Sequence, residues 1–223
     1  MSYLNWDTKT ITDFSPENIE AMYDAGYVFT RVDRGVMNKT RSFRVRLAEF
    51  APSSENRRIL RKAEHLEMRR ESIPYSGYSW KIGKLAKDFY DAHGADFSAN
   101  KVKEVLTDAS KTNFNTLLVF RDKTTGEDVG YAICYETDGI IHYSYPFYAE
   151  DPAEPSRGLG MMTMMLDWAK AQGKSLAYLG SLQRPSDTYK LQFSGGEWFT
   201  PSEVEGLSPG WQTDTVPLKS ILK

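Results

Sequence analysis

The stretch NTLLVFRDKTTGEDVGYAICYETDGIIHYSYPF, residues 115–147, decides the fold. It contains three runs with the β-branched and aromatic composition of strands, at 115–121, 129–136 and 140–147. Two polar connections, 122–127 and 137–139, separate these runs, and each carries a glycine that suits a tight turn. The stretch therefore predicts three consecutive antiparallel strands.

Helical and strand signals continue on both sides of this stretch. Downstream, a Pro-rich loop at 151–156 precedes a helix at 157–172 that Gly173 closes, and a strand at 175–179 follows. A short helix at 186–193 and a strand at 198–199 come last. Upstream, the patterns predict a helix from Pro16 to Gly26, strands at 27–31 and 42–50, and helices at 53–70, 80–92 and 98–110.

Three antiparallel strands, a crossover helix and a parallel strand are the layout of the GNAT acyltransferases. The predicted fold class is therefore α+β, a GNAT-like acyltransferase fold with a mixed, mainly antiparallel sheet flanked by helices. The predicted organisation is a small basic N-terminal region at 1–75 and an acyltransferase core at 76–223, with one continuous domain as the alternative.

The composition is that of a globular protein. The chain has 223 residues, of which 40% are hydrophobic, and no apolar run approaches the roughly 20 residues of a membrane span. The start of the sequence lacks the basic and apolar pattern of a signal peptide. The single cysteine, Cys134, lies in a strand-like run and is expected to be a buried, inert thiol, and the three histidines show no metal-ligand spacing. We expect a cytoplasmic monomer without a bound metal and without membrane contact.

The charge is uneven along the chain. The net charge is −2, but residues 31–70 hold twelve Arg and Lys against five acids, which makes this segment +7 and the remainder −9. The predicted helix at 53–70 places Arg57, Arg61, His65 and Arg69 at successive i+4 steps on one face. Such a face can follow a phosphate backbone without reading sequence. The alternative is a solvated amphipathic helix with internal salt bridges.

A second motif, Arg157-Gly158-Leu159-Gly160, lies where a loop ends and a helix begins. Glycines allow backbone N–H groups to approach a ligand, and a helix N-terminus carries partial positive charge, so this position suits a phosphate or a developing anion. The motif resembles the pyrophosphate loop of GNAT enzymes, although Met162 replaces the small residue expected there. The alternative is a glycine-rich helix start with no ligand. The methionine-rich run that follows is apolar nearly all round and predicts buried core.

Two blocks resemble the arginyl-tRNA–protein transferases and their bacterial leucyl relatives, enzymes of the N-end rule. The first block is the run 44–62, RVRLAEFAPSSENRRILRK, which has an Arg-bearing strand, an aromatic residue, a serine and then basic pairs in the register of the family. The second block comprises Tyr178-Leu179-Gly180 and Tyr189-Lys190-Leu191-Gln192-Phe193. The N-terminal cysteine cluster usual in the family is absent from this sequence.

This resemblance implies an aminoacyltransferase that moves an amino acid from charged tRNA to the α-amino group of a protein or peptide N-terminus. No cofactor is expected because the ester of the aminoacyl-tRNA is already activated. The expected catalytic residues are Tyr189, Lys190 and Glu136, with Asp138 a further candidate to bind the incoming amine. The expected tRNA contacts are Arg44, Arg46, Arg57, Arg58, Arg61 and Lys62. The expected donor-binding loop consists of Arg157, Gly158 and Gly160.

Two other classes of function share parts of these signals. A CoA-dependent N-acetyltransferase would use acetyl-CoA and the same glycine loop. A non-catalytic module that binds tRNA or a degron would keep the fold and lose the chemistry. Reversal of charge at Arg57 and Arg61 separates these classes, because it should abolish transfer from tRNA and leave a CoA enzyme largely intact.

Overall fold

The computed structural model describes residues 4–202, 204 and 207–222. The chain divides into two compact units. The first unit comprises residues 1–53, 137–142 and 169–223, and the second comprises 54–136 and 143–168. Of the predicted N-terminal region, residues 1–53 therefore lie in the first unit and 54–75 in the second.

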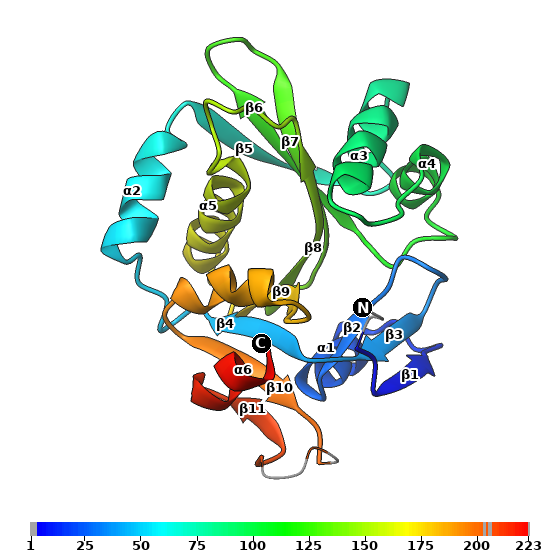
Figure 1. Ribbon diagram of the computed structural model, residues 1–223. Helices are drawn as coiled ribbons and strands as arrows, with labels where there is room; N and C mark the ends of the chain where they lie inside the picture. Colours follow the sequence, from blue (N-terminus) through cyan, green and yellow to red (C-terminus); the bar gives the residue numbers. More distant parts are fainter. Residues whose placement is uncertain (1–3, 203, 205–206, 223) are drawn as a thin grey trace. The chain divides into compact units, whose positions relative to one another are not determined.

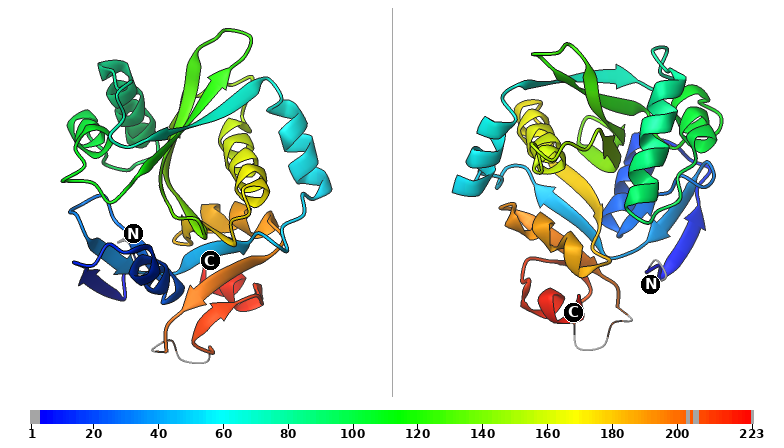
Figure 2. Two further views of the ribbon diagram at one scale, coloured as in Figure 1. Left: turned by 180° about the vertical axis from the view of Figure 1, so that it is seen from behind. Right: turned by 45° about the horizontal axis from the view of Figure 1, so that its top comes forward.

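The first unit contains two sheets, visible in Figures 1 and 2. The smaller has the strand order β1-β3-β2, and the larger runs β11-β10-β4-β9-β8, of which residues 140–142 of β8 belong to this unit. The paired strands of both sheets in this unit are antiparallel, except that β9 runs parallel to β8. Its elements are β1 (Asp7–Thr10), α1 (Pro16–Asp24), β2 (Tyr27–Phe29), β3 (Val36–Lys39), β4 (Ser42–Arg46), β9 (Leu176–Ser181), the 3-10 helix η1 (Pro185–Gln192), β10 (Gly196–Thr200), β11 (Gly210–Gln212) and α6 (Val216–Ile221).

The second unit contains a sheet covered by helices on both faces. Residues 143–148 of β8 belong to this unit, and the strand order is β8-β7-β6-β5. The views in Figures 1 and 2 agree that α3 and α4 lie on one face, whereas α2 and α5 lie on the other. Its elements are α2 (Ser54–Lys62), β5 (Leu66–Ser72), α3 (Trp80–Ala92), α4 (Ala99–Thr107), β6 (Thr116–Asp122), β7 (Asp128–Glu136), β8 (Ile140–Tyr148) and the greater part of α5 (Arg157–Ala171).

Local signals account for most of these boundaries. The Ser98 hydroxyl accepts a hydrogen bond from the Lys101 N–H at 3.2 Å and caps α4, at the residue where the predicted helix 98–110 begins. In the β6–β7 turn, the Asp122 carboxylate accepts from the N–H of Thr124 at 2.7 Å and of Thr125 at 3.2 Å, and Gly126 adopts φ +72°. A left-handed φ favours glycine, so the sequence alone locates this turn.

The predicted fold class is confirmed. The chain order β6-β7-β8-α5-β9, with β9 parallel to β8, is the layout expected from residues 115–179. The methionine-rich helix is core, since Met161, Met162, Met165 and Leu166 are buried. Cys134 is buried and unbonded to another cysteine, and burial raises the pKa of its thiol well above the usual value. No helix in the described part of the chain is long and apolar enough to cross a membrane.

The prediction of a helix over 53–70 is wrong beyond Lys62. The helix ends there, and residues 66–72 form β5, which pairs with β6 from Leu66 opposite Asp122 to Ser72 opposite Thr116. His65 and Arg69 therefore do not extend the basic stripe of α2. Pairing with β6 satisfies the backbone of residues 66–72, of which the local pattern assigns 66–70 to a helix, and this tertiary gain outweighs the local helix propensity. The sequence prediction also missed β1, β3, β11 and α6.

Candidate functional site

The candidate residues fall in both units. The first unit holds Arg44, Arg46, Asp138, Tyr189 and Lys190. The second unit holds Arg57, Arg58, Arg61, Lys62, Glu136, Arg157, Gly158 and Gly160.

Lys190 is a buried lysine whose side chain reaches the end of β9. It lies in η1, which begins with Pro185 and is capped by Asp187, whose carboxylate accepts from the Arg184 N–H at 2.9 Å. The Lys190 side chain is 7% exposed, and its Nζ donates to the Ser181 carbonyl at 2.8 Å. Burial lowers the pKa of Lys190, an effect that Asp187 partly opposes. A desolvated amine of this kind interacts strongly with any charge that develops beside it.

Tyr189 differs from its neighbour Lys190 in being accessible. It is 43% exposed, and its ring centroid lies 5.8 Å from the Lys190 ammonium. The pair therefore presents one accessible aromatic face and one buried donor on the same turn of η1. Asp138, by contrast, is exposed in the turn between β7 and β8, and we find no contact that prepares it for chemistry among the described residues.

A buried histidine that the sequence prediction missed lies in the same unit. His142 is 2% exposed, and its Nδ1 lies 2.8 Å from the Tyr23 hydroxyl. The Tyr23 ring also packs edge to face on Tyr178, with centroids 4.9 Å apart. Burial, with a smaller contribution from the charge of Lys190, lowers the pKa of His142 to about 3. The imidazole is therefore neutral at neutral pH, and the one sequence signal for it is a histidine within the apolar run 140–147.

Arg44 is engaged by two acidic side chains of its own unit, Glu197 and Asp24. Its Nε donates to Glu197 at 2.7 Å, its Nη1 donates to Asp24 at 2.8 Å, and its guanidinium stacks 3.9 Å from the Trp211 ring centroid. Its side chain is 11% exposed. This geometry fits a structural ion pair that joins β4 to β10 better than the phosphate contact expected from the sequence. Arg46 is half exposed and pairs with Glu49 at 3.0 Å.

The basic face of α2 is exposed. Asn56 and Ile59 are the buried residues of this helix, and the four basic side chains at 57, 58, 61 and 62 point to solvent. Arg58 forms a salt bridge with Glu55 at 2.5 Å. Two of the four, Arg61 and Lys62, lie in the last turn, where cations also stabilise the helix dipole. Within the second unit, α2 thus presents the positive surface that the sequence predicts over 57–62.

The glycines of the Arg157–Gly160 motif have a packing role. A Cβ on Gly158 would lie 2.5 Å from the Tyr148 hydroxyl, and a Cβ on Gly160 would lie 3.0 Å from the Ala63 Cβ. Arg157 is 7% exposed, and its guanidinium donates to Glu154 at 3.0 Å and to the Ala149 carbonyl. The motif therefore lets α5 approach β8 and α2 closely. This packing role agrees with the alternative interpretation of the motif, a glycine-rich helix start with no ligand.

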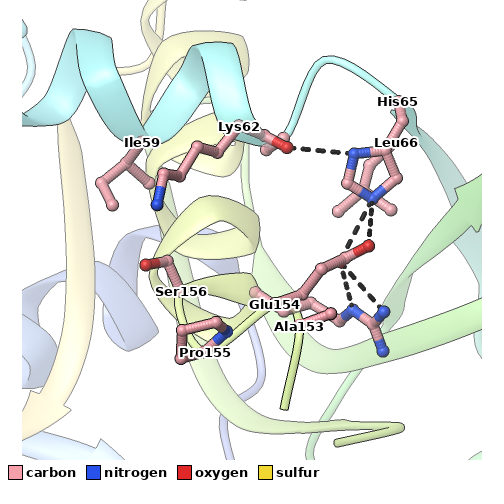
Figure 3. A pocket seen from close by; sticks show the side chains of 10 residues that line it. Ile59, Lys62, His65, Leu66, Ala153, Glu154, Pro155 and Ser156 are labelled. Carbon is pink, nitrogen blue, oxygen red and sulfur yellow. Dashed lines mark hydrogen bonds and ion pairs between the residues drawn. The ribbon is translucent and has the colours of Figure 1, made fainter. Parts of the chain in front are cut away.

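A pocket of about 250 Å³ adjoins this motif within the second unit. In Figure 3, Lys62 and Ser156 lie on one side of it, and His65 and Glu154 lie on the other. His65, Asp122 and Glu154 bring potential metal ligands within 4.8 Å of one another. However, Glu154 also forms an ion pair with Arg157 at 2.9 Å, so the charge of its carboxylate is already balanced by a cation of the protein. The pocket is lined by Ile59, Lys62, Ala63, His65, Leu66, Ala153, Glu154, Pro155, Ser156 and Arg157.

Glu136 is held at the end of β7 in the second unit. It is 8% exposed and forms an ion pair with Arg70. The Asn115 side chain fixes its backbone, since Asn115 Oδ1 accepts from the Glu136 N–H at 2.9 Å and Asn115 Nδ2 donates to the Glu136 carbonyl at 2.8 Å. To bind an incoming ammonium group, this carboxylate would have to exchange Arg70 for the substrate.

No protein-family model matches the chain. Two curated relatives are similar to most of it. An aspartate/glutamate leucyltransferase of Jannaschia sp. (strain CCS1) is 28% identical over 187 residues, covering 80% of this chain and 64% of the relative. An aspartate/glutamate leucyltransferase of Ruegeria sp. (strain TM1040) is 27% identical over 178 residues, covering 75% and 64%. The resemblance predicted from the two sequence blocks is thereby confirmed, and the chain spans less than two thirds of the length of either relative.

Solved structures resemble the chain more distantly. L-PGS from Bacillus licheniformis is 15% identical with a TM-score of 0.48, covering 86% of this chain and 52% of the other. FemX is 8% identical with a TM-score of 0.46, covering 76% and 60%. The fold assignment rests instead on the strand order and pairing described above.

Proposed function

We propose that this protein is an aminoacyltransferase that moves an amino acid from charged tRNA to the α-amino group of a protein or peptide N-terminus. The observation that carries the proposal is the similarity to two aspartate/glutamate leucyltransferases over 178–187 residues. By analogy with their names, the donated amino acid is leucine and the accepting N-terminal residue is aspartate or glutamate. The substrates are then a leucyl-tRNA and an acidic protein N-terminus.

The basic face of α2 supports a role in tRNA binding. Arg57, Arg58, Arg61 and Lys62 are exposed on nine residues of helix. Such cations bind phosphates through charge and need no particular base sequence. Arg44 is not part of this proposal, because Glu197 and Asp24 already engage its guanidinium.

Lys190 is the side chain best suited to act on the reacting centre. In the reaction the acceptor amine attacks the ester carbonyl, a tetrahedral oxyanion forms, and the tRNA 3′ oxygen leaves with a proton. A buried amine stabilises such an oxyanion more strongly than an exposed one, because little water competes for it. Lys190 is 7% exposed and lies beside Gly180 and the Ser181 carbonyl. Tyr189, accessible on the same turn, is positioned to contact a bound substrate.

A transfer assay tests the proposal directly. The purified chain would be incubated with leucyl-tRNA, with a pool of other aminoacyl-tRNAs or with acetyl-CoA, and with peptides that begin with aspartate, glutamate, arginine or alanine. Mass spectrometry should show the gain of one leucyl residue on the acidic peptides, and RNase should abolish it. A gain of an acetyl group instead would assign the protein to the CoA-dependent class. Binding of tRNA or peptide without any gain would assign it to the non-catalytic class.

A charge-reversal variant tests the α2 surface. Arg57→Glu with Arg61→Glu should raise the KM for the tRNA by about 10- to 100-fold and reduce the slope of log affinity against log salt by about 2. The matched control is Lys84→Glu with Lys87→Glu on α3, which makes the same charge change on another exposed helix of the second unit. Equal effects of the two double variants would show that α2 is not a specific tRNA surface.

A further inference from the structure

Arg41 is a half-buried arginine at the start of β4, in the first unit. The Leu182 N–H donates to the Arg41 carbonyl at 2.8 Å, which joins this residue to the segment that follows β9. The Arg41 Nη1 in turn donates to the Leu182 carbonyl at 3.3 Å, and the guanidinium lies 5.9 Å from the Trp6 ring centroid. The backbone carbonyl and the guanidinium of Arg41 therefore both contact Leu182, and the guanidinium also lies near the Trp6 ring.

The Arg41 guanidinium lacks partners that a buried cation normally has. Its Nε is buried and has no hydrogen-bond partner. Within the described ranges 4–202, 204 and 207–222, no carboxylate lies within ion-pair distance of it. Burial alone lowers the pKa of Arg41, with no carboxylate opposing the effect. Arg44, three residues further along, shows the contrast, because Glu197 and Asp24 engage it on two sides.

The geometry of this site favours a small carboxylate as its missing partner. A guanidinium presents a planar fork of N–H donors that matches a carboxylate in a bidentate pair. A nucleic-acid backbone is bound by arrays of exposed cations, as on α2, whereas Arg41 is a single cation partly enclosed by Trp6 and Leu182.

Arg41 and Lys190 both bind backbone carbonyls of neighbouring residues, Leu182 and Ser181. Lys190 Nζ binds the Ser181 carbonyl, and Arg41 Nη1 binds the carbonyl of the next residue, Leu182. The two cations therefore contact successive carbonyls where β9 ends. We propose that Arg41 binds the side-chain carboxylate of the acidic N-terminal residue of the acceptor. This inference rests on the proposed function and adds the residue that selects the acceptor.

Direct peptide binding, without tRNA, tests this inference independently of catalysis. Four peptides that differ only in an N-terminal aspartate, asparagine, glutamate or glutamine would be titrated into the full chain by calorimetry. The wild type should bind each acidic peptide about 10- to 100-fold more tightly than its amide counterpart. Arg41→Gln should reduce this preference to within about twofold. The matched control Arg121→Gln, at an exposed arginine of the β6–β7 hairpin, should keep it.

A side-chain NMR measurement covers the case in which Arg41→Gln fails to fold. The Nε–H signal of Arg41, assigned with Arg41→Lys, should shift when the aspartate peptide is added to the wild type and not when the asparagine peptide is added. An unchanged signal, or an acid preference that persists in folded Arg41→Gln, would overturn the inference. If the preference depends on Arg41 but no amino acid is transferred from tRNA, the carboxylate site stands and the proposed transferase activity fails.

Discussion

His142 makes the stability of this protein depend on pH in a predictable direction. In the folded chain the imidazole is 2% exposed and its pKa is lowered from 6.5 to about 3 by burial. In the unfolded chain it returns to its ordinary value. Between these two pKa values the unfolded state binds a proton that the folded state does not bind, so the free energy of unfolding falls as the pH falls. The contribution of His142 is fully present above pH 6.5 and is lost as the pH approaches 3.

The size of this effect follows from the same two pKa values. One pKa unit corresponds to about 1.4 kcal/mol, so lowering the pH from 7 to 4.5 should remove about 3 kcal/mol of stability through His142 alone. That is a large part of the roughly 5–15 kcal/mol that stabilises an ordinary domain. Acidic side chains add their own dependence in this range, so the effect of His142 must be isolated by difference.

The variant His142→Gln isolates the contribution of His142 to the pH dependence of stability. Glutamine can still hydrogen-bond the Tyr23 hydroxyl and does not titrate, so the variant should be less stable than wild type at pH 7 because of altered packing, by about 1–3 kcal/mol. On acidification to pH 4.5 it should lose about 3 kcal/mol less than the wild type. Urea unfolding followed by tryptophan fluorescence at several pH values measures both quantities.

A control and a refuting result complete this test. His93→Gln, at an exposed histidine that ends α3, is the matched control for the loss of a histidine outside the buried site. Parallel curves of unfolding free energy against pH for wild type and His142→Gln would show that His142 is protonated in the folded state at the same pH as in the unfolded chain. The reasoning from its burial would then be wrong.

Two further predictions concern the loop before α5 and the reacting centre. Gly158→Ala should lower the free energy of unfolding by about 1–3 kcal/mol, because its Cβ would lie 2.5 Å from the Tyr148 hydroxyl; a thermal midpoint equal to that of wild type would refute the packing role. Lys190→Met should lower kcat for transfer by about 10²- to 10³-fold, because it removes the proposed oxyanion donor, and circular dichroism should show a folded protein. A folded Lys190→Met variant with wild-type kcat would exclude Lys190 from the chemistry.

Much of the second unit could be predicted because its signals are local. The helix α3 lies at residues 80–92, as expected, and Ser98 caps α4 through its own hydroxyl. The three strands of 115–147 appear with small shifts at their ends. Caps, turn glycines and strand composition act within a few residues of the chain, so a sequence states them directly.

The environment of the candidate site residues depended on distant parts of the chain. The sequence predicted Arg44 as a tRNA contact on the strand 42–50, but Glu197, 153 residues away, draws its side chain into an ion pair. His142 is buried next to Tyr23, 119 residues away. Neither contact produces a local sequence pattern. The sequence could therefore identify Arg44 and His142 but could not predict which side chains surround them.

By itself the sequence determined the order of the main elements, the fold class, the exposed cations of α2 and the resemblance to the tRNA-dependent transferases. Only the tertiary structure decided that residues 66–72 form a strand, that Gly158 and Gly160 make room for Tyr148 and Ala63, and that Arg41 keeps a buried N–H without an acceptor. Propensity and capping are properties of neighbouring residues. Strand pairing, close packing and hydrogen-bond satisfaction depend instead on which distant atoms the completed fold brings within a few ångströms.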